Sequence, residues 1–408
     1  MKKFLIGAAT AAHQVEGNNI YSDCWAQEQM NYSSFKEPSL ACVDHYNRYE
    51  EDIRLLAEAG LNAYRFSVEW ARIEPREGEF SEEEIEHYRK VLECCRQYDI
   101  EPIVTLHHFS SPKWLISRGG WESENTVGYF VRYVKFVIAR LGNLMHYVCT
   151  INEANMGVQI AAAAQQLKNS LQIGLNTAEF QERTALIERE NQTVFGVKNP
   201  AVFLSMRSKA GDNIITEAHQ KAREAIKEIA PSLQVGLTLS LHDVQAEEGG
   251  EALAEEEWKR EFLHYVLFLK EDDFIGVQNY TRTVMGKDGA LPVIGKTTQM
   301  GYELYPEALE NVVKRVYHIL KVPVLVTENG IATDDDSLRC EFIDKAFAGM
   351  KNCLADGIPV KGYLHWSLLD NFEWQKGYCM KFGLIGVDRS SQERLPKRSL
   401  FHLGKKKI

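Results

Sequence analysis

The sequence predicts the α/β fold class and, within it, a single (β/α)8 TIM barrel with elaborated βα loops. Short apolar runs alternate with longer amphipathic segments along the whole chain, and eight such runs can be counted. Eight parallel strands, each followed by a helix, close a barrel. A doubly wound open sheet is the alternative, but no GxGxxG motif follows the first run. We therefore expect one domain that spans residues 1–408.

The apolar runs are each short enough for one strand and are bounded by turn or breaker residues. In chain order, the expected strands cover residues 4–8, 62–66, 102–106, 147–151, 235–239, 274–277, 322–326 and 360–365.

Start and stop signals mark helices between these runs. Gly60 ends the first amphipathic segment and Pro231 follows the fourth, as expected for helix ends. Ser81, with Glu84 three residues later, predicts an N-cap and a capping box. The expected helices cover residues 45–59, 81–98, 126–141, 213–229, 305–320 and 338–354.

Residues 155–212 interrupt this alternation. They run through a short alanine segment into a polar, charged stretch that shows no clear strand. We expect an elaborated excursion after the fourth strand, on the face of the barrel where active sites lie.

Composition and charge argue against several classes of partner. The net charge of −10 disfavours a nucleic-acid surface, because phosphate binding needs clustered Lys and Arg. No apolar run approaches the roughly 20 residues that a membrane helix requires. The eight cysteines show no CxxC motif or regular spacing, so a reducing cytoplasm is the expected compartment. Nothing in the sequence indicates an oligomeric state.

The amino terminus can be interpreted in two ways. Met1-Lys2-Lys3 precedes an apolar segment that ends in small residues, which mimics a signal peptide. Alternatively, the same segment is the first barrel strand and leads into a pocket residue.

Polar or aromatic side chains lie at the ends of the runs, where barrels collect functional groups. This set is larger than a purely structural barrel needs. Its members are Gln14, Glu16, Arg65, Glu69, His107, His108, Asn152, Glu153, His242, Asn279, Tyr280, Glu328, Asn329 and Trp366.

Two of these residues, Glu153 and Glu328, follow the fourth and seventh runs directly. Burying a carboxylate costs several kcal/mol unless it is compensated, so two such glutamates suggest a shared pocket. Glycoside hydrolysis needs two carboxyl groups, an acid and either a nucleophile or a base. Strand-end glutamates can also bind a helix N-terminus or an arginine, so spacing alone leaves both interpretations open.

The motifs around these residues resemble those of the family 1 glycoside hydrolases, the β-glucosidase family. The resemblance runs nearly from end to end of the chain. It rests on Asn152-Glu153 and Thr327-Glu328-Asn329-Gly330, together with the segments at residues 7–17, 64–73, 106–109 and 366–374. It implies a retaining mechanism in which Glu328 is the nucleophile and Glu153 is the general acid and then the general base.

The resemblance also implies the supporting residues. Arg65 and Tyr280 would keep Glu328 charged, and Asn152 would bind the sugar 2-hydroxyl. Trp366 would be the platform beneath the sugar ring. The remaining hydroxyls would be bound by Gln14, His108, Glu373 and Trp374.

Three further expectations follow from the same resemblance. His107 should be structural, because the motif aligns its neighbour with the sugar contact. Cleavage before Gln14 would destroy the sugar pocket, so the amino terminus should be a strand. A carboxylate at Glu373 would repel a phosphate dianion, which disfavours a 6-phospho-β-glucosidase.

The chain departs from the family pattern in places. Ala154 replaces a proline after the first glutamate, and Gln278-Asn279-Tyr280 replaces Asn-Tyr-Tyr. The excursion at 155–212 and the shortened stretch at 258–274 also differ. We expect these changes on the side of the pocket that receives the leaving group, the aglycone.

The leading hypothesis is therefore a retaining β-glycosidase that hydrolyses terminal non-reducing β-D-glucosyl residues, with β-galactosyl or β-fucosyl residues as further substrates. It needs no metal or other cofactor, and its only expected partner is a small-molecule β-glucoside. The alternative from a different class is a catalytically inactive sugar-binding scaffold on the same barrel.

Overall fold

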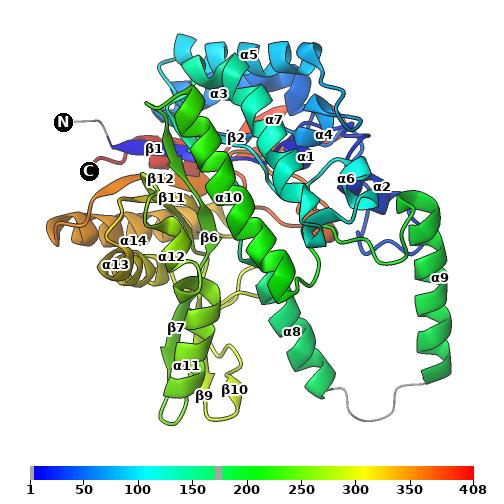
Figure 1. Cartoon of the computed structure of the whole chain (residues 1–408). Coiled ribbons are helices and arrows are strands. Elements are labelled where there is room, and N and C mark those ends of the chain that lie inside the picture. Colours follow the sequence, from blue (N-terminus) through cyan, green and yellow to red (C-terminus); the bar gives the residue numbers. More distant parts are fainter. Residues whose placement is uncertain (1–3, 171–176) are drawn as a thin grey trace.

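The computed structural model describes residues 4–170 and 177–408 and shows a parallel barrel (Figure 1). The strands follow the order β5-β4-β3-β2-β1-β12-β11-β8-β6 around the sheet. Each of the eight predicted runs forms a strand, which confirms the (β/α)8 barrel. The strands are β1 (Leu5–Ala9), β2 (Ala63–Ser67), β3 (Glu101–Thr105), β4 (Tyr147–Cys149), β5 (Gln234–Gly236), β6 (Thr238–Ser240), β8 (Ile275–Gln278), β11 (Val324–Asn329) and β12 (Val360–Trp366).

The fifth predicted run forms two short strands, β5 and β6, with Leu237 between them. β5 pairs with β4 and β6 pairs with β8, so together they close the barrel. The Leu237 carbonyl accepts a hydrogen bond from Gly276 N at 2.8 Å. At Gly236 a Cβ atom would lie 2.2 Å from the Phe274 carbonyl oxygen, so only glycine permits this close approach.

The six predicted helices all form, with ends that differ by a few residues, whereas α11 and α15 were not predicted. α10 begins four residues earlier than expected because the Ser208 hydroxyl caps it, accepting from Gly211 N at 3.0 Å. The long helices are α3 (His45–Glu58), α5 (Glu82–Gln97), α7 (Asn125–Leu141), α10 (Lys209–Ile229), α11 (Glu251–Trp258), α13 (Ala308–Leu320), α14 (Asp336–Ala355) and α15 (Arg398–Gly404). Short turns of helix are α1 (Ala12–Val15), α2 (Asp23–Glu28), α4 (Trp70–Ile73), α6 (Lys113–Ser117), α12 (Val266–Leu269), η1 (Gly120–Glu122), η2 (Gly142–Leu144), the π-helical η3 (Lys259–Leu263) and η4 (Trp374–Lys376).

The capping box predicted at the start of α5 is only half present. The Ser81 hydroxyl accepts from Glu84 N at 3.2 Å, as expected for an N-cap. The Glu84 carboxylate does not return to the Ser81 N–H, which donates to the Ile73 carbonyl instead. Glu84 accepts from the Tyr46 hydroxyl at 3.1 Å, because a tertiary partner lies within reach.

The excursion after β4 is mostly helical in its described part and contains no strand there, which agrees with the absence of a strand signal. It forms α8 (Met156–Ser170) and α9 (Thr177–Phe195). Figure 1 shows both helices extending away from the barrel. Glu190 ties α9 back to the barrel loops, because its carboxylate accepts from the backbone N–H groups of Asn31 and Tyr32.

Two smaller sheets are formed by loop segments outside the barrel. β7 (Asp243–Ala246), β9 (Arg282–Gly286) and β10 (Gly289–Ala290) form one, and β13 (Ile385–Val387) pairs with β14 (Arg394–Pro396) in the other. The first sheet joins the loops that follow the fifth and sixth barrel strands, so it elaborates the carboxyl-terminal face of the barrel.

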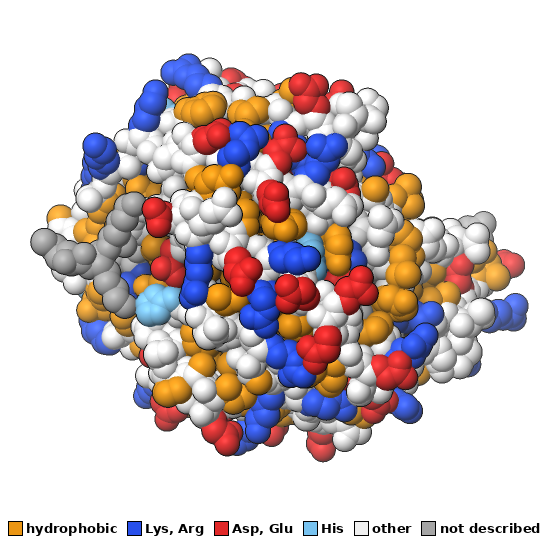
Figure 2. Space-filling view, turned by 90° about the horizontal axis from the view of Figure 1, so that it is seen from above, with side chains coloured by type: hydrophobic (Ala, Val, Ile, Leu, Met, Phe, Trp, Pro, Cys, Tyr) orange, Lys and Arg blue, Asp and Glu red, His pale blue; other side chains and the backbone are white. Residues whose placement is uncertain are grey.

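Figure 2 shows the face of the molecule formed by α3 and α5. Lys and Arg side chains alternate there with Asp and Glu, and the described part of this face carries no continuous basic patch. Within residues 4–170 and 177–408, no helix is long and apolar enough to cross a membrane. All eight cysteines are free thiols, and every one except Cys379 is buried.

Candidate active site

A cavity of about 530 Å³ opens at the carboxyl ends of the barrel strands. Seven of the ten residues expected at the site line it directly, and Arg65, Asn152 and Gln14 are hydrogen-bonded to lining residues from below. The lining members are His108, Glu153, Tyr280, Glu328, Trp366, Glu373 and Trp374. The structure therefore brings the whole predicted set to one place.

Glu328, near the end of β11, is buried and receives three hydrogen bonds. Arg65 Nη1 and Gln278 Nε2 donate to Oε1 at 2.6 and 2.7 Å, and the Tyr280 hydroxyl donates to Oε2 at 2.5 Å. Burial raises the pKa of Glu328 above its ordinary value, while Arg65 and then the Tyr280 hydrogen bond act in the opposite direction. The donors thus favour a carboxylate at this position.

Glu153 has a different environment. It follows Asn152 after β4, has a positive φ of 42°, and is 6% exposed. A non-glycine residue in this backbone region is held there by its surroundings, here a 3.0 Å bond from Glu153 N to Thr238 Oγ1. Burial, followed by the charge of Glu328, raises the pKa of Glu153 to about 8. The three donors at Glu328, one of them the charged Arg65, favour ionisation of Glu328 before Glu153.

Asn152 joins the two halves of the site. Its Oδ1 accepts from Arg65 Nη2 at 2.6 Å and from Gln278 Nε2 at 2.7 Å. Its Nδ2 donates to His108 Nε2 at 3.0 Å. His108 Nε2 is therefore the acceptor, and Nδ1 carries the proton. Burial lowers the pKa of His108 well below its ordinary value, so the ring is neutral.

Gln14 and Glu373 form a polar edge on the other side of the cavity. Gln14 Nε2 donates to the Phe372 carbonyl at 2.7 Å and to Glu373 Oε2 at 3.2 Å. Burial, then the charge of Glu328, raises the pKa of Glu373 to about 8. Among the described residues, Gln14 Oε1 and His108 Nδ1 are buried without a partner. Buried polar atoms are nearly always paired, so these two are available to a ligand.

The aromatic rings frame this polar edge. Trp366 and His108 stack with centroids 5.6 Å apart, and Trp374 stacks on His13 at 5.7 Å. Both indoles are buried. A flat indole beside polar groups suits a sugar ring, which has an apolar face and a polar edge.

Other strand-end residues are structural, as their partners show. His107 pairs with Ser111 Oγ at 3.0 Å, which agrees with the expectation for this residue. Glu16 accepts from Arg72 and Tyr88, and Glu69 from Ser110 and a helix N–H. Asn279 and Asn329 bond to backbone carbonyls. His242 lines the outer rim of the cavity, fixed by Glu261 at 2.7 Å.

The expectation that the departures from the family pattern lie on the aglycone side is wrong for Gln278, which lies at the catalytic centre. Its Nε2 donates to both Glu328 and Asn152, so it is a third donor to the buried carboxylate. The signal was its position immediately after an apolar run, but a glutamine there carries no specific chemistry by itself.

Replacing Gln278 by leucine is expected to destabilise the ionised form of Glu328, because one hydrogen-bond donor to the carboxylate is lost. A hydrogen bond to a charged group is worth about 1.5–3 kcal/mol, so kcat/KM should fall by about 10- to 100-fold. The acid limb of its pH profile should move to higher pH, because the pKa of Glu328 rises when a donor is lost. Gln234→Leu, at the opposite end of the fifth strand, is the matched control. An unchanged acid limb in Gln278→Leu would contradict this role.

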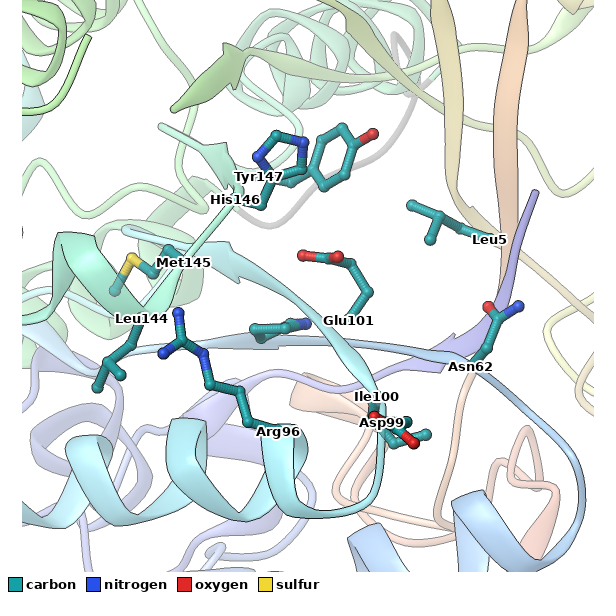
Figure 3. Close-up of a pocket in the computed structure, with 11 residues that line it drawn as sticks. Leu5, Asn62, Arg96, Asp99, Ile100, Glu101, Leu144, Met145, His146 and Tyr147 are labelled. Atoms are coloured by element: carbon teal, nitrogen blue, oxygen red, sulfur yellow. The ribbon is translucent and has the colours of Figure 1, made fainter. Parts of the chain in front are cut away.

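A second cavity, of about 510 Å³, lies at the opposite end of the barrel (Figure 3). Leu5, Glu101 and Tyr147 in its wall are the first residues of β1, β3 and β4. Residues at this end of a barrel serve stability, whereas function gathers at the carboxyl ends. This second cavity is therefore similar in volume to the candidate active site, but it lies at the end of the barrel where catalytic residues are not expected. No cluster of three or more His, Cys, Asp or Glu that could hold a metal is found in the described ranges.

Comparison with known proteins agrees with this geometry. A sequence model described as glycosyl hydrolase family 1 matches residues 1–269 and 264–405. The chain belongs to glycosyl hydrolase family 1. The resemblance found in the motifs is thereby confirmed, and the protein is an enzyme of the O-glycosyl hydrolase type.

Relatives of this family 1 hydrolase include enzymes named for two sugar types. It is 28% identical to a β-glucosidase of Agrobacterium sp., over 97% of this chain and 92% of that protein. It is 29% identical to a 6-phospho-β-galactosidase of Lacticaseibacillus casei, over 97% and 95%. The crystal structure of the β-glycosidase BGL167 is similar with a TM-score of 0.90 and 46% identity, over 98% and 95% of the two chains. An apo β-glucosidase structure has a TM-score of 0.89 and 39% identity, over 98% and 97%.

Proposed function

We propose that this family 1 hydrolase is a retaining β-glycosidase that removes terminal non-reducing β-D-glucosyl residues, and by the same chemistry β-galactosyl or β-fucosyl residues. The asymmetry between the two glutamates carries the proposal. Glu328 has three donors that favour its charge, whereas burial and the charge of Glu328 keep Glu153 protonated to about pH 8. One carboxylate and one carboxylic acid in one cavity are what double displacement needs.

The proposed reaction has two steps. In the first, Glu328 attacks the anomeric carbon while Glu153 gives its proton to the leaving oxygen, and the aglycone departs. In the second, Glu153, now ionised, takes a proton from water, which attacks the anomeric carbon and releases Glu328. Asn152, held by Arg65 and Gln278, presents its amide to the sugar 2-hydroxyl, where contacts strengthen in the transition state.

Glu373 supports an unphosphorylated sugar. It shares the polar edge of the cavity with Gln14, and its carboxyl group can accept from sugar hydroxyls. Once ionised, above its pKa of about 8, it would repel a phosphate dianion. Lys376 also lines the cavity, and one of the relatives is named for a 6-phosphorylated sugar, so a 6-phospho-β-glycosidase is the rival candidate.

Parallel assays with p-nitrophenyl β-glucoside and its 6-phosphate test the two candidates. Above pH 8, where Glu373 is ionised, we expect at least a 100-fold preference in kcat/KM for the unphosphorylated substrate, because two like charges in a cavity of low dielectric repel strongly. Proton NMR of the first sugar released should show the β-anomer. Preference for the phosphate, or initial release of the α-anomer, would contradict the corresponding part of the proposal.

The pH dependence of kcat/KM should show a basic limb near pH 8, because Glu153 must be protonated and loses its proton there. Glu373 has a similar pKa, so its contribution to the basic limb must be distinguished from that of Glu153. A leaving group that needs no proton, such as 2,4-dinitrophenolate, should remove the Glu153 contribution and leave that of Glu373. An unshifted basic limb for both alkyl and dinitrophenyl glucosides would exclude Glu153 as its origin.

A further inference from the structure

A groove continues outward from the catalytic cavity. It has a volume of about 310 Å³ and shares two wall residues, His242 and Tyr302, with the cavity that holds the two glutamates. The groove lies against β9 and the segment at residues 290–294, which begins at the last residue of β10. A molecule whose sugar occupies the cavity can therefore extend into the groove without leaving the protein surface.

The outer wall of this groove is a run of exposed apolar residues. Leu291, Val293 and Ile294 are 36%, 45% and 96% exposed, and Pro292 stands between them. Single exposed apolar side chains are ordinary on a protein surface. Four in succession along the wall of a groove that opens from an active site indicate a surface that is covered when a ligand binds.

The charged groups of the groove are largely satisfied by one another. Arg282 donates to both oxygens of Glu303, each at 2.8 Å, and its guanidinium lies 4.0 Å from the ring centroid of Tyr305. This arrangement leaves the fork of the guanidinium occupied, so it is not free to bind the hydroxyls of a further sugar.

The catalytic cavity also carries apolar side chains beyond its sugar-binding side. Its sugar-binding side carries His108, Glu373 and the two indoles. The remainder of its lining includes the apolar residues Met156, Ile160, Leu204 and Met300, and also the polar residues Gln159, Ser240, Gln375 and Lys376. Hydroxyl groups of a second sugar unit that lie against the four apolar side chains would lose their hydrogen bonds to water without a replacement, which is costly. An apolar chain would instead be removed from water along the same path.

We propose that this groove, formed by residues 290–294 together with Tyr302 and His242, receives an elongated apolar aglycone, so that the preferred substrates are β-glycosides of long aliphatic alcohols and not oligosaccharides. The inference rests on the proposed glycosidase function and names its substrate class. It places the specificity in a segment that does not touch the glutamates.

A series of n-alkyl β-glucosides from methyl to octyl, assayed below micelle-forming concentrations, tests the proposal. Burying one methylene group is worth about 0.8 kcal/mol, or roughly fourfold. Because the groove is open on one side, kcat/KM should rise about twofold per methylene once the chain reaches it. Octyl β-glucoside should also exceed cellobiose by at least tenfold.

The variants Val293→Asp and Ile294→Asp test whether the rise of kcat/KM with chain length depends on the wall of the groove. Both residues are exposed, so the variants should fold, and each should flatten the rise with chain length while p-nitrophenyl β-glucoside turnover stays within twofold. Leu267→Asp is the matched control, since Leu267 is 73% exposed in α12, outside both cavities, and it should keep the full rise.

Failure of the inference is distinguishable from failure of the proposed function. If p-nitrophenyl β-glucoside is hydrolysed but kcat/KM does not depend on alkyl length, or the rise survives in Val293→Asp and Ile294→Asp, the groove assignment is overturned. If the unmodified protein hydrolyses none of the glucosides, the proposed function itself is overturned.

Discussion

Glu328→Gln is expected to reduce kcat by at least about 10⁴-fold on every substrate, including aryl glucosides with activated leaving groups. The amide has nearly the shape of the carboxylate but cannot form the covalent bond to the anomeric carbon. A good leaving group does not help, because the missing step is the attack itself. The assay is kcat on 2,4-dinitrophenyl β-glucoside.

Glu69→Gln is the matched control for this substitution. Glu69 is also a buried glutamate near a strand end, but its partners are Ser110 and a helix N–H, and it does not line the cavity. Burial raises the pKa of Glu69 to about 7, so a neutral group is already tolerated there near neutral pH. We expect activity within a few-fold of the unmodified enzyme. Substantial turnover by Glu328→Gln would remove the basis for its assignment as the nucleophile.

Glu153→Ala is expected to show a loss of activity that depends on the leaving group. Alkyl glucosides, whose leaving oxygen needs a proton, should lose about 10²–10⁴-fold in kcat/KM, the usual contribution of general acid catalysis. Dinitrophenyl glucoside should keep most of its kcat/KM, but its kcat should fall, because the second step lacks its base. The glycosyl-enzyme should therefore accumulate.

Azide should rescue this second step in Glu153→Ala. The small anion can occupy the space vacated by the carboxylate and attack the anomeric carbon from the face opposite Glu328, without needing a base. The product should be β-glucosyl azide, identified by NMR. Glu328→Gln should show no such rescue. An α-azide from Glu153→Ala, or equal losses on alkyl and dinitrophenyl substrates, would reverse or exclude the assigned role of Glu153.

The barrel could be predicted from the sequence because its signals are local. Each strand is a short apolar run with breakers at its ends, and helices such as α5 carry a start signal at Ser81. The break of the fifth strand at Leu237 was not predictable, since it depends on which neighbour each half meets. The capping box at Glu84 failed for the same reason, because Tyr46 is distant in sequence but close in space.

The members of the candidate site were predictable from motifs, but their connections were not. Nothing in the sequence shows that Gln278 bridges Asn152 and Glu328, because that contact joins residues 126 and 50 positions apart. The raised pKa of Glu373 likewise arises from burial and from the charge of Glu328, which only the folded chain brings together. The assigned chemistry of both glutamates therefore remains a prediction that solution experiments must test.

Incubation with 2,4-dinitrophenyl 2-deoxy-2-fluoro-β-glucoside tests the central claim most directly. The fluorine slows both steps, while the activated leaving group lets the first proceed, so a retaining enzyme should be trapped as its covalent intermediate. We expect one stoichiometric adduct in the intact mass, and peptide mapping should place it on Glu328. An adduct on another residue, or no adduct and no burst of dinitrophenolate, would contradict the account and favour a catalytically inactive sugar-binding barrel.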